Sequence, residues 1–248
     1  MVMPGATKPE ARLLRSADGA AQAEQLAAAI AAELAAALTR RASASLVVSG
    51  GRTPQAMFAH LAQHAIDWQR VQVTLADERW VGPADPASNE SIVRSALLRE
   101  RAAAAQFVAL KNDAATPEEG ANAAWRAIKA MPQPFDVIVL GMGDDGHVAS
   151  LFPGSSGLAA ALDERAPPGC VAMQPSTAPH ARLSLNLAAL LRARRICIQI
   201  SGAGKWTVYQ QALADGPVEE MPVRAVLRQG AVPVDVYWCP DQSSATTP

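Results

Sequence analysis

Short apolar segments rich in β-branched residues alternate with helix-forming segments along most of this chain, and this alternation restricts the possible folds more than any other feature. Bounded apolar runs of this length predict buried strands. They lie at 43–50 (SASLVVSG), 71–77 (VQVTLAD), 135–142 (FDVIVLGM), 194–201 (RRICIQIS) and 234–240 (VDVYWCP), with a weaker one at 107–110 (FVAL). Strands that alternate with helices predict a mostly parallel, Rossmann-like α/β sheet with helices on both faces.

The segments between these strands have helical spacing. In the Ala-rich segment 17–40, Leu26, Ile30, Leu34 and Leu38 recur at intervals of four and form one face of a long helix. Further helices are predicted at 54–65, at 88–101, at 117–131 and from about Lys205 onward.

The chain is predicted to form a single domain over 1–248. Its 248 residues and 50% hydrophobic content are enough to bury a sizeable core. No linker, repeat or low-complexity segment interrupts the core at about 16–240. The polar or proline-bearing ends, 1–15 and 241–248, are expected to fray.

Charge and composition exclude several classes of protein. A formal net charge of -1 argues against a nucleic-acid surface and gives no general attraction to anionic membranes. No apolar run reaches membrane-spanning length, and the N-terminus lacks the apolar region of a signal peptide, so we expect a cytoplasmic protein. Cys170, Cys197 and Cys239 are too far apart in sequence to form a metal or redox pair and are expected to be reduced and mostly buried.

Glycine-rich and charged motifs follow several predicted strands, which is where ligands bind in open α/β sheets. The first is SGGRTP, in which Gly50 and Gly51 can adopt left-handed conformations and approach a ligand closely. Thr53 is expected to cap the next helix, with Pro54 as its first residue. The exposed N–H groups at that helix start favour an anion such as phosphate, although an ordinary strand–helix turn explains the motif equally well.

A charged triplet, Asp77-Glu78-Arg79, follows the second strand. Arg79 is suited to stabilise a developing oxyanion or to orient a carboxylate. For the triplet alone, a solvated loop is the simpler interpretation. Ser88 and Asn89 are expected only to cap the next helix.

The motif GMGDDGH at 141–147 follows the clearest strand and formally contains G-x-G-x-x-G. We reject a dinucleotide site because Asp144 and Asp145 would face the pyrophosphate, and Pro153 ends the following helix too early. What remains is an imidazole, His147, two residues from a carboxylate. Histidine transfers protons near neutral pH, and either aspartate could hold its tautomer, so His147 is a candidate base.

Two further cations are candidates for a phosphate site. Lys205 in SGAGK follows a strand, but Gln199 stands where a P-loop has its first glycine, so the motif is not a P-loop. The positive charge of Lys205 is still suited to bind a phosphate. Arg182 lies near the start of the apolar segment ARLSLN and would either reach a phosphate or be a charged residue at the edge of the fold. Solvated roles explain both residues about equally well.

Taken in order, SGGRTP, DERWV with SN, GMGDDGHVASLFPG, ARLSLN and SGAGK resemble the 6-phosphogluconolactonase family over about 45–210. GMGDDGHVASLFPG is the most specific of them. Val148, where threonine is usual, and Ser184 are mild departures from the family pattern. The broader group includes glucosamine-6-phosphate deaminases, which share the fold and the D-G-H element.

The resemblance implies hydrolysis of 6-phospho-D-glucono-1,5-lactone to 6-phospho-D-gluconate, a step of the oxidative pentose phosphate pathway, by an enzyme without cofactor or metal. It implies that His147 activates water, that Asp145 supports it and that Arg79 holds or polarises the lactone. The implied phosphate ligands are Gly50, Gly51, Thr53, Lys205 and Arg182. The expected partner is the small sugar phosphate lactone, with no nucleic acid or membrane, and the protein is expected to be a monomer or homodimer.

Two alternatives remain at this point. Deaminases carry N-E-P after their G-H-I-A-F, whereas Ser150-Leu151-Phe152-Pro153 contains no glutamate here, and Arg79 replaces their usual tyrosine. Both differences favour the lactonase. A non-catalytic sugar-phosphate sensor would need a DNA-binding module, and residues 1–44 offer only one Ala-rich helix.

Overall fold

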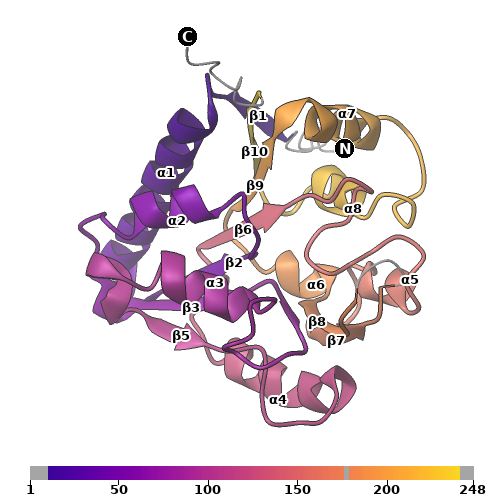
Figure 1. Cartoon of the computed structure of the whole chain (residues 1–248), viewed down its shortest axis with the longest axis horizontal. Helices are drawn as coiled ribbons and strands as arrows, with labels where there is room; N and C mark the ends of the chain where they lie inside the picture. The colour runs from indigo at the N-terminus through magenta and orange to yellow at the C-terminus, as the bar shows by residue number, and fades with distance from the viewer. Residues whose placement is uncertain (1–10, 176–178, 241–248) are drawn as a thin grey trace, which may run out of the picture.

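The computed structural model describes residues 11–175 and 179–240, and at its centre lies a seven-stranded sheet in the order β1-β10-β9-β6-β2-β3-β5 (Figure 1). Each pair of neighbouring strands in this sheet is parallel. The strands are β1 (Arg12–Arg15), β2 (Ala44–Val48), β3 (Val71–Leu75), β5 (Gln106–Val108), β6 (Val137–Gly141), β9 (Ile196–Ser201) and β10 (Val234–Cys239).

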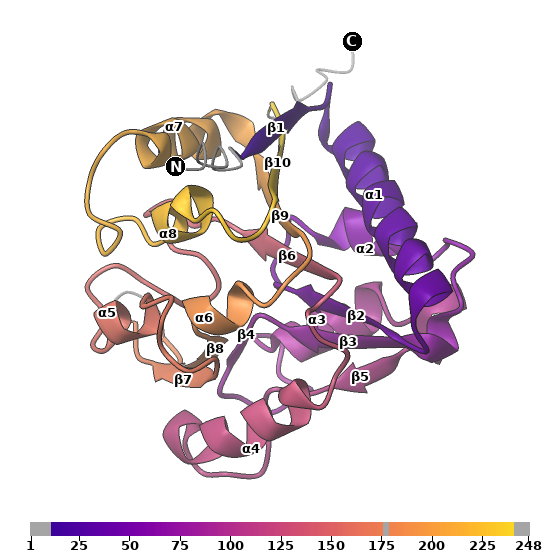
Figure 2. The ribbon, with the colours of Figure 1, turned by 180° about the vertical axis from the view of Figure 1, so that it is seen from behind.

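Helices lie on both sides of the sheet, with α1 and α2 on one side and α6, α7 and α8 on the other (Figures 1 and 2). The helices are α1 (Gly19–Arg40), α2 (Gln55–Leu61), α3 (Asn89–Ala96), α4 (Pro117–Lys129), α5 (Leu158–Ala161), α6 (Leu187–Leu190), α7 (Gly202–Leu213) and α8 (Val223–Arg228), with 3₁₀ turns at Trp68–Arg70 and Glu100–Ala104. The predicted α/β fold class is confirmed. Within the described residues, no helix is both long and apolar enough to cross a membrane.

Helix α1 shows how the sequence pattern builds this core. Asp18 caps it by accepting a hydrogen bond from the Ala21 N–H (2.9 Å). Leu26, Ile30 and Leu34, on the predicted face, are fully buried, and each contributes about 1.5–3 kcal/mol of hydrophobic stabilisation. The same face therefore holds the long helix against the sheet and α2.

A second, three-stranded antiparallel sheet was not predicted. It has the order β4-β8-β7 and comprises β4 (Asp77–Arg79), β8 (Arg182–Leu185) and β7 (Cys170–Met173). Strands of three or four residues are too short to show a period-two pattern, so pairing with neighbours defines them rather than local sequence. The pairing places Arg79 directly opposite Arg182.

Residues 12–15 were predicted to fray, and this is wrong, because they form edge strand β1 beside β10. The Arg12 guanidinium pairs with the buried Asp235 carboxylate (Nε–Oδ1 2.9 Å), which also binds Arg195 (Nη1–Oδ2 2.7 Å). This anchor is tertiary, so the local sequence does not reveal it. Residues 1–10 and 241–248, also expected to fray, lie outside the described residues.

Two helix starts differ from their predictions. Thr53 was expected to cap the second helix, but α2 begins at Gln55, and Pro54, whose side chain makes no capping hydrogen bond, occupies the cap position. Helix α7 begins at Gly202, earlier than expected, so Lys205 lies in its first turn. Ser88 does cap α3, accepting from the Ser91 N–H (3.2 Å).

The sheet reverses its winding between β2 and β6. From β2 the chain continues to β3 on one side, whereas from β6 it continues to β9 on the other. The loops after two such strands diverge and leave a crevice at their carboxyl ends, the usual ligand site in open α/β folds. The motifs after β2 and β6 therefore face each other across this crevice.

Candidate active site

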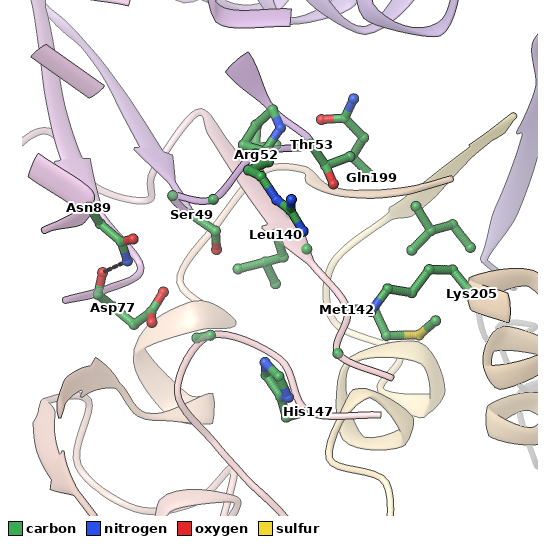
Figure 3. Close-up of a pocket in the computed structure, with 18 of the residues that line it drawn as sticks. Ser49, Arg52, Thr53, Asp77, Asn89, Leu140, Met142, His147, Gln199 and Lys205 are labelled. Carbon is green, nitrogen blue, oxygen red and sulfur yellow. Dashed lines mark hydrogen bonds between the residues drawn. The ribbon is translucent and has the colours of Figure 1, made fainter. Parts of the chain in front are cut away.

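A pocket with a volume of about 420 Å³ occupies the crevice at the carboxyl ends of β2, β6 and β9 (Figure 3). Its lining includes seven of the residues singled out from the sequence: Gly50, Gly51, Thr53, Arg79, His147, Arg182 and Lys205. Asp145 is not among the lining residues but contacts His147. In Figure 3, His147 lies on one side, Arg52 and Thr53 on the opposite side, and Lys205 reaches in from α7. The structure thus gathers all the sequence candidates around one cavity.

His147 and Asp145 form a hydrogen-bonded pair at this pocket. The Asp145 Oδ1 lies 2.5 Å from His147 Nδ1 and also accepts the His147 backbone N–H (3.0 Å). A carboxylate accepts at Nδ1, so that nitrogen carries the hydrogen and Nε2 keeps its lone pair. The Phe152 ring packs against the imidazole with a centroid distance of 4.1 Å. The imidazole is therefore held on two sides, with Nε2 available as a base.

The Asp145 carboxylate is strongly biased toward its ionised form. Burial is the largest single influence and raises the pKa of Asp145, but hydrogen bonds from the His147 ring and backbone, together with the imidazolium charge, outweigh it and lower the pKa from 3.8 to about 2. A carboxylate that stays ionised keeps Nδ1 protonated and stabilises an imidazolium when one forms.

The glycines of GMGDDGH serve this pair rather than a pyrophosphate. A Cβ on Gly143 would overlap His147 Nδ1 and Asp145 Oδ1, so only glycine fits there. Gly146 has φ +78°, in the left-handed region, and lets the turn place Asp145 and His147 on the same side. The Gly143 N–H closes the turn onto the His147 carbonyl (2.8 Å).

Asp144 and Asp145, which the sequence could not separate, have different partners. The Asp144 Oδ1 lies 2.9 Å from Lys205 Nζ, and its side chain is 88% exposed. Asp144 therefore pairs with the lysine of the first α7 turn, while Asp145 serves the histidine.

Arg79 and Arg182 project from paired strands of the small sheet. Arg79 Nη1 donates to the Ala87 carbonyl (2.8 Å) and to Asn89 Oδ1 (2.5 Å). Arg182 is buried, donates Nε to the His180 carbonyl (3.2 Å), and lies over the Phe152 ring at 5.8 Å. Burial lowers the pKa of Arg182, as does the charge of Arg79, whereas Asp77 and Glu78 raise it. Two neighbouring cations give this wall of the pocket a positive field.

The two acids of the charged triplet have separate roles. Asp77 lines the pocket and accepts from the Ser150 hydroxyl (2.5 Å). Glu78 is 1% exposed, is not among the lining residues, and accepts from Ser88 and from three backbone N–H groups. Burial raises the pKa of Glu78, and these hydrogen bonds only partly offset it. Glu78 therefore stabilises the backbone that carries Arg79 and Asn89, without lining the pocket itself.

Several pocket residues were missed or misjudged from the sequence, among them Asn89, Phe152 and Gln199. Asn89 was assigned only a capping role, yet its amide faces the pocket and binds Arg79. No local signal distinguishes a capping asparagine from one that also binds a distant arginine. Gly51 has φ +105°, as expected, but Gly50 does not adopt a left-handed conformation, so that part of the prediction is wrong.

The described residues contain no cluster of side chains suited to bind a metal ion. Over residues 11–175 and 179–240, no group of three or more His, Cys, Asp or Glu side chains is arranged to hold a metal ion.

Comparisons with known proteins are consistent with this geometry. A family model described as glucosamine-6-phosphate isomerases/6-phosphogluconolactonase matches residues 17–238. The chain is 45% identical over 220 residues to a 6-phosphogluconolactonase of Rhizobium meliloti strain 1021 (89% of this chain, 95% of the relative). It is 45% identical over 221 residues to one of Pseudomonas aeruginosa (89% and 92%). A crystal structure of a 6-phosphogluconolactonase from Shewanella baltica OS155 superposes with a TM-score of 0.90 at 46% identity, covering 94% of this chain and 100% of the other.

Proposed function

This chain belongs to the family of glucosamine-6-phosphate isomerases and 6-phosphogluconolactonases, and on that premise we propose that it hydrolyses 6-phospho-D-glucono-1,5-lactone to 6-phospho-D-gluconate with His147 as the base. The observation that carries this proposal is the His147–Asp145 pair, which lies on the same pocket as Arg79, Arg182 and Lys205. A base and several cations around one cavity suit an anionic substrate that is attacked by water.

The chemical steps use His147 and Arg79, both of which line the pocket. His147 Nε2 takes a proton from water as the water oxygen attacks the lactone carbonyl carbon. The carbonyl π electrons move to oxygen, and Arg79 stabilises the resulting tetrahedral oxyanion. When the carbonyl re-forms, the bond to the ring oxygen breaks, and the imidazolium returns its proton to that oxygen. Asp145 holds the tautomer and balances the imidazolium charge throughout.

The substrate phosphate supplies binding energy that positions the reacting carbon. Its proposed ligands are the Gly50–Gly51 backbone, Thr53, Lys205 and Arg182, all of which line the pocket. Arg182 lies opposite Arg79 in the pairing of β4 with β8.

Phe152 favours the lactonase over the deaminase reaction. Its ring packs on His147 at 4.1 Å, directly before Pro153, where deaminases are expected to carry a glutamate. An apolar ring there offers no carboxylate for ring-opening chemistry. The proposal also includes a cytoplasmic location and a monomeric or homodimeric state, which cell fractionation and size-exclusion chromatography test.

A coupled assay tests the activity. Glucose 6-phosphate and its dehydrogenase generate the lactone in place, and 6-phosphogluconate is followed through a second dehydrogenase, with the spontaneous hydrolysis rate subtracted. We expect the wild-type protein to accelerate hydrolysis far above that background. A rate equal to background would overturn the proposal, and ammonia release from glucosamine 6-phosphate would then be measured.

Replacing Lys205 by alanine should raise KM and leave kcat nearly unchanged, because the lysine is proposed to bind the phosphate rather than the reacting carbon. A charged hydrogen bond is worth roughly 1.5–3 kcal/mol, so the expected increase in KM is about 10- to 100-fold. Initial rates over a range of lactone concentrations measure it.

Asp144→Asn provides the matched comparison for Lys205. Asp144 competes with the phosphate for the lysine, and exposed ion pairs are worth about 0.2–1 kcal/mol, so KM should fall by roughly 1.4- to fivefold. An unchanged KM in Lys205→Ala would remove this lysine from the phosphate site.

Asp145 should add no protonation step to the pH dependence of kcat/KM above about pH 4. The pKa of Asp145 is about 2, below its ordinary 3.8, so any stabilisation from its ionised form is complete above 3.8 and is lost only as the pH falls through about 2. Asp145 therefore stays ionised above about pH 4. Buffer series with the coupled assay measure the slope, and an acid limb of slope two would contradict this assignment.

A further inference from the structure

We propose that Asn89 is a positioning residue for Arg79, and that Gly50 lacks a side chain in order to make room for it. This inference rests on the proposed role of Arg79 at the lactone carbonyl. It gives new roles to a residue expected only to cap a helix and to a glycine expected only to approach a phosphate.

The Asn89 side chain is fixed at both ends. It is 3% exposed and lies at the first position of α3. Its Nδ2 donates to the Asp77 carbonyl (2.9 Å), and its Oδ1 accepts from Arg79 Nη1 (2.5 Å). A carbonyl on one side and a guanidinium on the other allow only this orientation of the amide. The backbone N–H of Asn89 donates to Glu78 Oε1 (2.7 Å), which holds the residue against the charged triplet.

These contacts determine how the Arg79 guanidinium lies. Nη1 has two hydrogens, and both are used, by Asn89 Oδ1 and by the Ala87 carbonyl. Nε is buried without a hydrogen-bond partner, and Nη2 makes no hydrogen bond with any residue in the described part of the chain. Because the guanidinium is planar, fixing one corner sets the direction of the others. Asn89 thus leaves Nη2 as the donor available to a ligand in the pocket.

Gly50 is the structural counterpart of Asn89. A Cβ built on Gly50 would overlap the Cβ, Cγ and Oδ1 of Asn89. The Gly50 φ is not in the left-handed region, so conformational freedom is not the reason for a glycine at this position. The loop after β2 and the start of α3 approach so closely that only a hydrogen fits between them. The proposed phosphate loop and the proposed oxyanion ligand are therefore joined through one side chain.

Four variants test this arrangement: Asn89→Ala, Asn89→Asp, Gly50→Ala and the double variant Gly50→Ala/Asn89→Ala. Removing one donor to an oxyanion costs about 10²–10³-fold in kcat, and misaiming one should cost somewhat less. We expect Asn89→Ala and Gly50→Ala each to lower kcat about 10- to 100-fold, with KM changed less than kcat. Asn89→Asp keeps the acceptor for Arg79 and should retain kcat within about fivefold of wild type.

The double variant is the decisive measurement. Asn89→Ala removes Oδ1 and Cγ, the two atoms that a Cβ at position 50 would approach most closely, and leaves the contact with the Cβ of residue 89 (2.8 Å). Gly50→Ala should therefore cost several-fold less in the Asn89→Ala background than in the wild-type background. Multiplicative losses would show that the two residues act separately and would overturn the link between them.

Other outcomes are equally informative. A wild-type kcat in Asn89→Ala would overturn the positioning role. A kcat in Asn89→Asp as low as in Asn89→Ala would also overturn it, because the important contact would then be the hydrogen bond from the Asn89 amide to the Asp77 carbonyl rather than the one to Arg79. Asn89→Asp also serves if Asn89→Ala fails to fold, which circular dichroism would show. This inference alone is refuted if the wild type has lactonase activity, a His147 variant loses it, and Asn89→Ala keeps it unchanged. A wild type without lactonase activity refutes the proposed function instead.

Discussion

Replacing His147 by alanine should lower kcat about 10²–10⁴-fold, which is the usual cost of losing a positioned general base. The imidazole lines the pocket, and it is held by a carboxylate that fixes its tautomer and by an aromatic ring that restricts its rotation. Without it, water must attack the lactone without a proton acceptor. The coupled assay with the spontaneous rate subtracted measures the loss.

His60→Ala is the matched control for this substitution. His60 is exposed on α2, is not among the pocket-lining residues, and should leave kcat unchanged. The His147→Ala fold must be intact for the comparison, which near-ultraviolet circular dichroism checks. Activity of the His147 variant within about threefold of wild type would mean that another group is the base.

Replacing Glu78 by alanine should lower the free energy of unfolding by about 3 kcal/mol or more, because it leaves several buried donors without partners. Its Oε1 accepts the N–H groups of Arg79 and Asn89 (both 2.7 Å), and its Oε2 accepts the Glu90 N–H (2.7 Å) and the Ser88 hydroxyl (3.0 Å). Alanine offers no acceptor, and the side chain is too deeply buried for water to replace it. Urea unfolding measures the change.

Two further variants make the Glu78 prediction specific. Glu78→Gln keeps one oxygen but turns an amide NH₂ toward N–H donors, so its stability should fall between wild type and alanine. Glu119→Ala, at an exposed glutamate in the first turn of α4, should change stability by less than about 0.5 kcal/mol. A loss below about 1 kcal/mol for Glu78→Ala would show that the buried network relaxes without cost.

The parts of the fold that the sequence predicted are those in which local pattern and tertiary role agree. Strands β6 and β9 are apolar runs because helices cover both of their faces, and the α1 face repeats because it packs on the sheet. Strands β4, β7 and β8 are too short to carry such a pattern, and β1 is held by an ion pair with Asp235. These elements depend on their neighbours, which no local segment encodes.

The pocket lining could likewise be predicted in part from the sequence. Motifs after strand ends could be placed together because parallel strands end at one edge of the sheet, so His147, Lys205 and the loop after β2 were correctly expected to meet. The separate partners of Asp144 and Asp145, and the approach of Gly50 to Asn89, depend on distances of a few ångströms between remote segments. Composition and spacing do not contain those distances.

The order of strands in the central sheet has a consequence for synthesis of the chain. Among the strands in the described residues, β1 comes first in the chain, and in the sheet it pairs with β10, which comes last. β1 must therefore stay unpaired until β10 has been made, because Arg12 cannot bind Asp235 before then. Pairing between segments 223 residues apart is slow to form, so closure of this edge is expected to be a late event of folding. A nascent chain stalled before β10 would leave both β1 and one edge of β9 open to chaperones or to other chains.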